Sequence, residues 1–362
     1  MKPIAEKRSL QKALLGWFDR EQRDMPWRDN RDPYPIWVSE IMLQQTQVKT
    51  VIPYFERWMK SFPTLKKLAG SREDTVLKHW EGLGYYSRAR NLHKASKIVV
   101  KEYKGKVPDT YDTLIQLPGI GRYTAGAILS IAFDQQIPVL DGNVKRVLSR
   151  LFVMQSNGVP AAHEKILWET SAELVLDKRP GDFNQAMMEL GATVCLPTKP
   201  FCLVCPLQKR CEAQKQGVVD QFPAPKVRAS TKKIEVSAAV ITRGGKVYIQ
   251  QRLHGGLMGG LWEFPGGKRK PNETEEECLK REIKEEMGIP ITIAKKLMTI
   301  KHSYTQFRVT LNVFWCPWKS GRIRATQCEQ WKWVKYEDLN QYTFPAANVK
   351  IVKSLLGNGG KF

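Results

Sequence analysis

Apolar residues recur every three or four positions from Leu10 to about Leu190, which is the spacing of helices that bury one face. Glycine and proline residues separate these segments, as they do in turns between helices. Residues 36–48, 122–133 and 143–153 each predict one such helix. The first half of the chain is therefore expected to be all-α.

The second half has a different pattern. Residues 217–232 hold prolines and cationic residues without a clear period, so they predict a linker. Residues 233–251 then predict two strands around a Gly-Gly turn, and residues 274–287 predict a helix. Aromatic and β-branched residues predict further strands at 307–316 and 331–335. This alternation is typical of a mixed α/β domain.

These patterns divide the 362 residues into a helical domain at 1–216, a linker at 217–232 and an α/β domain at 233–362. Both domains are long enough to bury a core of their own. The hydrophobic content of 42% and the charged content of 26% are those of a folded globular protein, not of a disordered chain.

The net charge of +22 points to a polyanionic partner. A charge that only keeps the surface soluble is the alternative, but a single-sign excess of this size is unusual for that purpose. No apolar run reaches the roughly 18 residues of a membrane span, and the N-terminus lacks the pattern of a signal peptide. We therefore expect a cytoplasmic, nucleoid-associated protein that binds nucleic acid.

Four of the seven cysteines lie close together, separated by six, two and five residues. They are Cys195, Cys202, Cys205 and Cys211. Four thiolates in one short segment can hold a 4Fe-4S cluster or a zinc ion. Zinc sites usually have two pairs of close ligands and this segment has one, so the cluster is favoured over zinc and over buried structural cysteines. Such a cluster would order a loop that carries Lys199, Lys209 and Arg210 toward phosphates.

Two further motifs precede the cysteines. Residues 117–128 place Gly119 and Gly121 in a tight turn before a helix, where main-chain N–H groups suit a DNA phosphate. Residues 139–150 place Asp141 directly before another helix. Taken alone, Asp141 is explained as an ordinary helix N-cap.

The glycine-rich turn, the aspartate and the cysteine spacing, in this order, resemble the endonuclease III superfamily of helix-hairpin-helix glycosylases over residues 8–215. In members of that superfamily that cleave the DNA backbone, a lysine follows the Gly-Ile-Gly-Arg turn and forms a Schiff base. Tyr123 stands there in this chain, and a phenol cannot form an imine. The resemblance therefore implies a monofunctional glycosylase without lyase activity.

Residues 26–28, 38–48 and 82–92 are similar to the MutY adenine glycosylases, which remove adenine mispaired with 8-oxoguanine or guanine. Cleavage of a purine N-glycosidic bond leaves a sugar cation and an anionic base, so one group must protonate the base and another must stabilise the cation. By this resemblance, Glu40 protonates adenine at N7. Asp141 stabilises the sugar cation, with a transient covalent bond as an option.

The role of Glu40 requires a raised pKa, and its apolar neighbours Trp37 and Ile41 could supply one. The alternative is that Glu40 lies on the solvated face of an amphipathic helix. Asp141 must instead stay ionised, so the two carboxyl groups need different surroundings.

The resemblance also assigns supporting residues. Tyr123 and Asn143 would support the two carboxyl groups, and Arg28 would line the adenine pocket with Gln185 near it. The residues expected to contact the duplex, from which adenine must be flipped, are the wedge residues Gln45 and Tyr85, the 8-oxoguanine contacts Thr46 and Leu83, and the phosphate contacts Lys145 and Arg146. For Leu83 and Tyr85, ordinary core packing is the alternative.

The second half contains a complete Nudix box, from Gly267 and Glu273 through residues 281–286 to Gly288. Three of its carboxylates share one helix face because they stand at i, i+3 and i+4. They are Glu282, Glu285 and Glu286. Clustered carboxylates bind Mg²⁺, and a solvated acidic helix face is the alternative.

MutY enzymes carry a C-terminal domain related to MutT, the hydrolase of 8-oxo-dGTP, and use it to recognise 8-oxoguanine. Arg252 and Asn348 match positions that read the oxidised guanine in that hydrolase, whereas Gln330 stands where it has a glutamate. Tyr304 and Thr305 are the nearest match to the Phe-Ser-His loop that reads DNA, but the histidine is missing.

The resemblance thus implies a multi-domain monomer that acts on double-stranded DNA holding A:8-oxoguanine or A:G mispairs. Its fold is an all-α helix-hairpin-helix glycosylase domain with an iron–sulfur cluster loop, followed by an α/β Nudix-like domain. Three rival hypotheses stay open at this point. They are a thymine-glycol-type glycosylase with lyase activity, a protein whose second domain also hydrolyses 8-oxo-dGTP with Mg²⁺, and a catalytically silent DNA-binding module.

Overall fold

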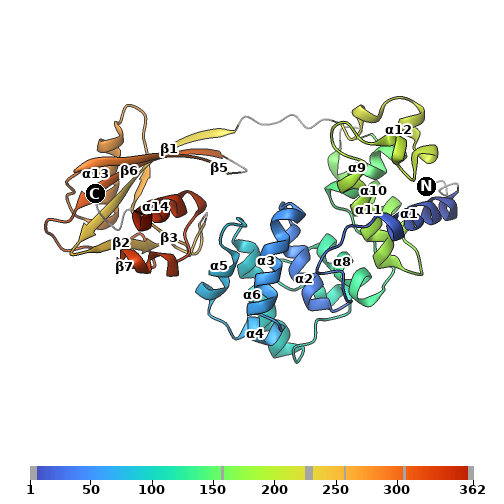
Figure 1. Ribbon diagram of the computed structural model, residues 1–362, viewed down its shortest axis with the longest axis horizontal. Coiled ribbons are helices and arrows are strands. Elements are labelled where there is room, and N and C mark those ends of the chain that lie inside the picture. The colour runs from blue at the N-terminus through green and yellow to red at the C-terminus, as the bar shows by residue number, and fades with distance from the viewer. Residues whose placement is uncertain (1–5, 156–158, 225–230, 257, 305–306, 358–362) are drawn as a thin grey trace. The chain divides into compact units, whose positions relative to one another are not determined.

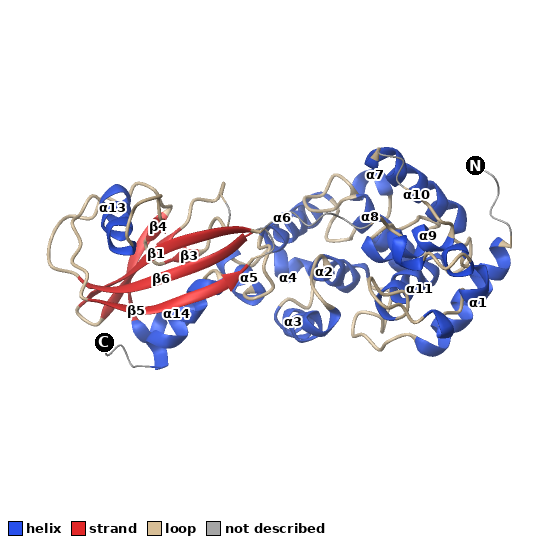
Figure 2. Cartoon of the chain, turned by 90° about the horizontal axis from the view of Figure 1, so that it is seen from above, coloured by secondary structure: helices blue, strands red, loops and turns tan. Residues whose placement is uncertain are grey.

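The computed structural model describes residues 6–155, 159–224, 231–256, 258–304 and 307–357. The chain forms two compact units (Figure 1, Figure 2). The first unit comprises Met1–Ser71 and Asn91–Val227, and the second comprises Arg72–Arg90 and Arg228–Phe362. Within the described part of the chain, no helix is long and apolar enough to cross a membrane.

The first unit is helical, as predicted. Its helices are α1 (Lys7–Glu21), α2 (Pro33–Leu43), α3 (Val48–Ser61), α4 (Leu65–Ala69), most of α6 (Ser87–Glu102), α7 (Tyr111–Leu114), α8 (Arg122–Phe133), α9 (Gly142–Leu151), α10 (Pro160–Leu174), α11 (Pro180–Thr193) and α12 (Glu212–Lys215). Short 3-10 turns at Cys202–Val204, Gln208–Arg210 and Val219–Gln221 lie in and after the cysteine segment.

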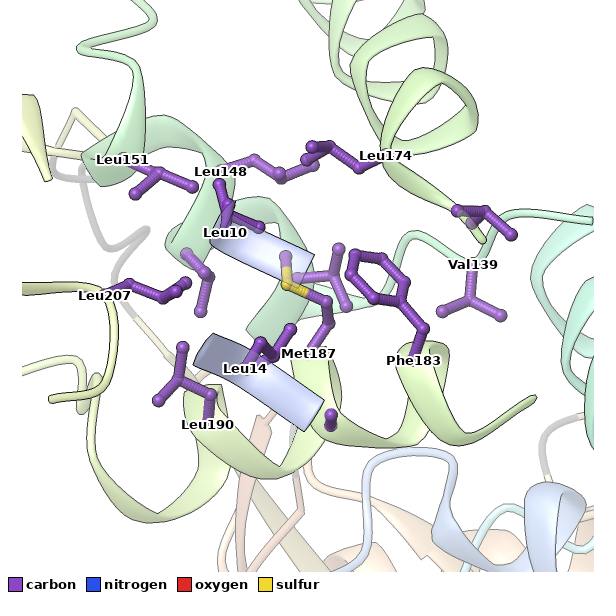
Figure 3. Close-up of a cluster of buried hydrophobic side chains, with 14 of the residues drawn as sticks. Leu10, Leu14, Val139, Leu148, Leu151, Leu174, Phe183, Met187, Leu190 and Leu207 are labelled. Carbon is purple, nitrogen blue, oxygen red and sulfur yellow. The ribbon is translucent and has the colours of Figure 1, made fainter. Parts of the chain in front are cut away.

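The core that supports the site forms where α1, α9 and α11 meet (Figure 3). Leu10, Leu14 and Phe18 recur at four-residue spacing along α1 and are almost fully buried. Phe183 and Met187 of α11 pack into the same cluster. Burial of each such side chain contributes about 1.5–3 kcal/mol, so this packing holds the start of α9 and one face of α11 in place.

One helix prediction needs a correction. The helix expected at 36–48 ends at Leu43, and α3 begins only at Val48. The residues between them form a turn because Gln45 adopts a positive φ of 57°, which a continuing helix excludes. The helices predicted at 122–133 and 143–153 are found as α8 and α9, the latter within two residues at its end.

The second unit holds the mixed α/β domain and the segment Arg72–Arg90. Its elements are α5 (Glu73–Trp80), β1 (Lys232–Arg243), β2 (Lys246–Gln251), β3 (Trp262–Glu263), β4 (Gly266–Lys268), α13 (Glu275–Met287), β5 (Lys295–Ser303), β6 (Phe307–Pro317), β7 (Gln330–Lys335), a 3-10 helix at Tyr336–Gln341 and α14 (Ala346–Gly357). The strand order is β3-β2-β1-β6-β5, with β4 paired to β1 and β7 paired to β2.

The sheet is mixed, because β1 and β6 pair in parallel while the other pairs are antiparallel. Alternate residues of β1 point to opposite faces. Val240 packs into the cluster that contains α14, and Ile241 packs into the cluster that contains α13. The two helices therefore cover opposite faces of the sheet (Figure 2).

Local sequence explains where α13 lies. Thr274 and Glu277 form a reciprocal capping box at its start, and Gly288 ends it with a positive φ of 69°. The Nudix carboxylates predicted to share a helix are therefore on one continuous helix, which packs against the strands β1 and β4.

Candidate active site

A cavity of about 840 Å³ opens in the first unit between α2, α8, α11 and the start of α9. Many of the residues singled out in the sequence line this one cavity. They are Arg28, Glu40, Gln45, Thr46, Tyr123, Asp141, Asn143 and Gln185. Elements that are distant in sequence therefore bring the two predicted carboxyl groups and their supporting residues together.

Glu40 lies in the middle of α2, a helix capped by Asp32 and buried over most of its length. Its side chain is buried, with 5% of the residue exposed, and its Oε2 accepts a hydrogen bond of 2.7 Å from Tyr123 Oη. Burial raises the pKa of Glu40 to about 7, and the nearby Asp141 adds to this rise. A carboxyl group with this pKa can hold and donate a proton near neutral pH.

Tyr123 lies on α8, directly after the glycine-rich turn. Its Oη also contacts Met188 Sδ at 3.2 Å. Burial raises the pKa of Tyr123 well above its usual value, and the neighbouring Glu40 and Asp141 add to the effect. The phenol therefore keeps its proton and acts as a hydrogen-bond donor to Glu40.

Asp141 is the N-cap of α9, so it has the capping role that its position in the sequence predicts. Its Oδ1 accepts from Val144 N at 2.7 Å, and its Oδ2 accepts from Asn143 Nδ2 at 2.9 Å. Burial raises the pKa of Asp141, while these hydrogen bonds and Arg146 oppose the rise. Asp141 thus has several donors for its ionised form, whereas Glu40 has the single phenol that the structure records for its carboxyl group.

Asn143 packs closely against Gly191 of α11. A Cβ added at Gly191 would lie 2.5 Å from Asn143 Cβ, so glycine is required for the two helices to approach this closely. Arg146 Nη2 donates to Asn143 Oδ1 and to Gly191 O, both at 2.8 Å, and its Nε donates to Cys195 O at 2.7 Å. The structure therefore gives Arg146, which we expected at a phosphate, a role in fixing Asn143.

The opposite wall of the cavity contains a residue that the sequence analysis missed. Glu189 is buried on α11, and it accepts from Arg23 Nε at 2.6 Å and from Arg28 Nη2 at 3.0 Å. Burial alone would raise the pKa of Glu189, but the two arginines outweigh it and lower the pKa. Arg28 Nε also donates to Gln185 Oε1 at 2.9 Å. Since Gln185 and Glu189 stand at i and i+4, the helical spacing could have identified Glu189.

The turn between α2 and α3 carries Gln45 and Thr46 at the mouth of the cavity. Gln45 is exposed and has a positive φ, which is an unfavourable conformation for a residue other than glycine. Such strain often occurs at functional sites, where the surrounding structure enforces it.

The glycine-rich turn has the expected form. Gly119 has a φ of 82°, and a Cβ there would lie 2.8 Å from Asn91 Cβ, so both conformation and space require glycine. Gly121 is the N-cap of α8. Lys145 on α9 makes an ion pair of 2.8 Å with Glu164, at the surface of the unit.

The described part of the second unit includes Leu83 and Tyr85. Leu83 is buried, whereas Tyr85 is 38% exposed and has a positive φ of 46°. Arg88 holds this turn, because its Nη2 donates to Leu83 O and to Gly84 O and its guanidinium lies over the Tyr85 ring. The side chain of Leu83 is thus mostly covered within its own unit, and Tyr85 is the side chain that the turn exposes.

The four cysteines of the predicted cluster are free thiols that are half-buried. Burial raises the pKa of Cys205 to about 12, and the other three thiols are close enough to add to this rise. Among the described residues, no group of three or more histidine, cysteine or acidic side chains is placed so as to hold a metal ion. The four thiols nevertheless supply the donor type and number that a four-iron, four-sulfur cluster requires.

In the Nudix box, Arg281 Nη1 donates to Glu282 at 2.8 Å and to Glu285 at 3.2 Å. Glu286 has a different partner, since its Oε2 accepts from Gln250 Nε2 at 3.1 Å. Burial raises the pKa of Glu286 to about 7, and the nearby Glu263 adds to the rise.

The structure shows the contacts of three further residues that the resemblance to MutY and MutT singled out. Gln330 donates to Gln251 Oε1 at 2.6 Å and lies on the face that α14 covers, away from α13. Tyr304 Oη accepts from Ala347 N at 3.4 Å, and its ring packs against His302. Asn348 Oδ1 accepts from Phe264 N at 3.3 Å. Thr305 lies outside the described residues.

Comparison with known proteins identifies two families in this chain. Residues 38–173 match the family model "HhH-GPD superfamily base excision DNA repair protein", and residues 237–354 match the NUDIX domain. The chain is 36% identical to an adenine DNA glycosylase of Rattus norvegicus, over 97% of this chain and 78% of the relative. It is 35% identical to an adenine DNA glycosylase of Homo sapiens, over 98% of this chain and 75% of the relative.

Among solved structures, a thermostable thymine-DNA glycosylase matches with a TM-score of 0.52 and 28% identity. The match covers 58% of this chain and 97% of that structure. The helical half therefore has the fold expected from its sequence, and its partner domain is the expected Nudix domain.

Proposed function

This chain belongs to the adenine DNA glycosylase family of base-excision repair enzymes, and from that premise we propose that it removes adenine mispaired with 8-oxoguanine or guanine. The reaction is hydrolysis of the N-glycosidic bond, without cleavage of the DNA backbone. The observation that carries this proposal is the pair of Glu40 and Asp141 in one cavity, with Tyr123 in hydrogen-bond contact with Glu40.

The two carboxyl groups have separate tasks in this proposal. Glu40 donates its proton to the N7 atom of adenine as the bond to the sugar breaks, which its raised pKa supports. Tyr123 orients Glu40 by donating to it. Asp141, with its main-chain and Asn143 donors, stays ionised and stabilises the cationic sugar.

The wall formed by Arg28, Gln185 and Glu189 is proposed to bind the flipped base. An arginine fixed by a buried carboxylate presents donors with a set direction, and adenine offers ring nitrogens as acceptors. Because Glu189 is held in its ionised form by two arginines, it can also accept from the amino group of adenine.

The other assignments concern the duplex. The strained and exposed Gln45 and Tyr85 are proposed to fill the space that adenine leaves. Thr46 and Leu83 would contact 8-oxoguanine, and the turn of Gly119 and Gly121 would bind a phosphate. Lys145 would bind a phosphate too, after release from Glu164. In the second unit, Tyr304 and Thr305 would recognise 8-oxoguanine.

The chain is proposed to act as a monomer on double-stranded DNA. The four cysteines are proposed to hold a four-iron, four-sulfur cluster, whose part is structural: it orders the loop that carries Lys199 and Lys209. The proposed domain boundaries stay at 1–216, 217–232 and 233–362.

A direct test replaces Glu40 by Gln and Asp141 by Asn in single-turnover assays of adenine release. Loss of a general acid or of the cation-stabilising group should slow release by about 100-fold or more. The matched control is Glu56→Gln on the exposed side of α3. Release by Glu40→Gln at the rate of the control would refute the assignment.

A second candidate activity is hydrolysis of 8-oxo-dGTP at the Nudix box with Mg²⁺. The neighbouring, half-buried carboxyl groups of Glu263 and Glu286 favour it. Burial raises the pKa of both, and Glu263 adds to the rise at Glu286, although Arg252 pairs with Glu263 and opposes the rise there. Arg281 opposes it, because it already binds Glu282 and Glu285 and supplies positive charge where Mg²⁺ would lie. If the full chain releases pyrophosphate with Mg²⁺, Glu285→Gln should abolish this release and the exposed Glu276→Gln should not. No release from the wild type ends the hypothesis.

A further inference from the structure

Arg150 in the last turn of α9 is the most completely bonded buried cation that the structure describes near the cysteines. The residue is 2% exposed. Its Nε donates to Val219 O at 3.1 Å and Phe222 O at 2.8 Å, its Nη1 to Cys195 Sγ at 3.3 Å and Leu196 O at 2.7 Å, and its Nη2 to Pro197 O at 3.2 Å.

These acceptors belong to two stretches that are distant along the chain. One stretch, 195–197, follows α11 and contains the first cysteine of the segment. The other, 219–222, follows the last cysteine, and from there the chain continues toward the second unit. The guanidinium of Arg150 therefore donates hydrogen bonds to the main chain at both ends of the cysteine segment.

The positive charge of Arg150 is buried without a carboxylate among its recorded hydrogen-bond partners. The recorded acceptors within the described residues are four main-chain carbonyls and one thiol, and none of them is a carboxylate. A buried cation without a compensating negative charge is strongly unfavourable. Thiolates that bind a cluster would supply that charge, and a hydrogen bond to a charged acceptor is about twice as strong as one to a neutral acceptor.

We propose that Arg150 is a positioning residue that couples occupancy of the cysteine site to the order of residues 219–222. The inference rests on the proposed cluster. When Cys195 is a metal-bound thiolate, Arg150 is held by it and in turn holds Val219 and Phe222 in place. When the cluster is removed, Arg150 loses its counter-charge and these residues are released.

This role differs from that of Arg146, four residues earlier on α9. Arg146 bonds Asn143 and so faces the active site. Arg150 bonds the carbonyls on either side of the cysteine segment, and within the described part of the chain none of its hydrogen bonds reaches a residue that lines the catalytic cavity. Substitution of Arg150 should therefore change the stability of the cluster segment more than the chemistry at Glu40.

The experiment measures iron per chain and amide hydrogen exchange of the full-length protein, before and after the cluster is removed by a chelator. Removal from the wild type should speed exchange in 219–222 by about tenfold or more, which corresponds to about 1.4 kcal/mol of local stability. Arg150→Met should show this faster exchange while still loaded, and it should lose iron to the chelator faster than the wild type.

Arg150→Lys separates charge from geometry, since lysine keeps the charge but cannot reach all the acceptors. It should retain iron longer than Arg150→Met and still show faster exchange in 219–222. Arg179→Met is the control, because Arg179 is half-exposed and bonds only surface carboxylates in the recorded contacts. It should leave both measurements unchanged.

The outcomes distinguish this inference from the proposed cluster. A wild-type protein that holds no iron under anaerobic reconstitution contradicts the cluster itself. A wild type that holds iron, with Arg150→Met and Arg150→Lys both equal to it in exchange at 219–222, overturns the role of Arg150 and leaves the cluster in place. If Arg150→Met does not fold, the lysine variant alone decides.

Discussion

At the scale of single residues, the site depends on how the surroundings of two carboxyl groups differ. Glu40 is buried among apolar side chains of α2 and accepts from one phenol, so its pKa rises to about 7. Asp141 caps α9 and accepts from a main-chain N–H and from Asn143. The same functional group is thereby prepared for proton donation in one place and for charge stabilisation in the other.

The pH dependence of adenine release should therefore follow Glu40. The single-turnover rate should fall as the pH rises through about 7, because Glu40 then loses the proton that it must donate. In Glu40→Gln, the remaining slow release should not show this titration. A wild-type rate that stays constant from about pH 6 to about pH 8 would argue against Glu40 as the acid.

The unfolding free energy should also depend on the protonation of Glu40, and the contribution of Glu40 should fall as the pH rises. Because the folded-state pKa of Glu40 lies above its unfolded value, its contribution is complete below the unfolded pKa of 4.5 and is lost as the pH rises through about 7. Glu40→Gln is neutral throughout, so its unfolding free energy should rise relative to that of the wild type over this range. Parallel pH profiles of chemical denaturation for the two proteins would contradict the buried position of the carboxyl group.

At the scale of elements, local sequence patterns predict many of the helices and turns. The elements that they do not predict depend on conformations or contacts that lie outside the local pattern. The periods of α8 and α13 and the Gly-Gly turn between β1 and β2 follow local rules, and the sequence predicts them closely. The end of α2 at Leu43 could not be predicted, because the local sequence does not indicate the positive φ of Gln45.

The candidate site likewise contains residues that the sequence predicts and one that it does not. Glu40, Asp141 and Tyr123 were found through motif resemblance, and the structure brings them into one cavity. Glu189 was missed because a glutamate on a helix is ordinarily a surface residue. Its spacing of four from Gln185 puts the two residues on one helix face, but only the packing of α11 against Arg23 and Arg28 shows that Glu189 is buried and paired. Burial and long-range ion pairs are not visible in local sequence patterns.

The close approach of α9 and α11 gives a prediction at this scale. In Gly191→Ala, the added methyl group would collide with Asn143, so Asn143 and Asp141 should shift. Overpacking of this kind costs about 1–3 kcal/mol of stability, and adenine release should slow by at least roughly tenfold. Thermal unfolding and single-turnover assays measure the two effects.

Gly16→Ala on α1 is the control for this substitution, because a Cβ there meets only the end of Arg20 at 3.8 Å. It should leave adenine release unchanged and stabilise the helix by about 0.5–1 kcal/mol. Equal activity of Gly191→Ala and Gly16→Ala would mean that the spacing of α9 and α11 does not position Asp141.

At the scale of the whole molecule, the net charge of +22 should dominate binding to DNA. If six to ten phosphates are neutralised, affinity should fall about a thousandfold or more between roughly 50 and 200 mM salt. A duplex without a mispair should show a similar slope at lower affinity, since phosphate contacts carry no sequence information. Binding that is independent of salt would contradict the electrostatic interpretation.

The central claim is that this chain releases adenine by acid-assisted hydrolysis and does not cleave the backbone. The most direct measurement is single-turnover release from duplexes with adenine opposite 8-oxoguanine, guanine or thymine, each analysed with and without mild alkali. We predict fastest release opposite 8-oxoguanine, slower release opposite guanine, and strand breaks only after alkali. Strand breaks without alkali, or no adenine release from any duplex, would contradict the account.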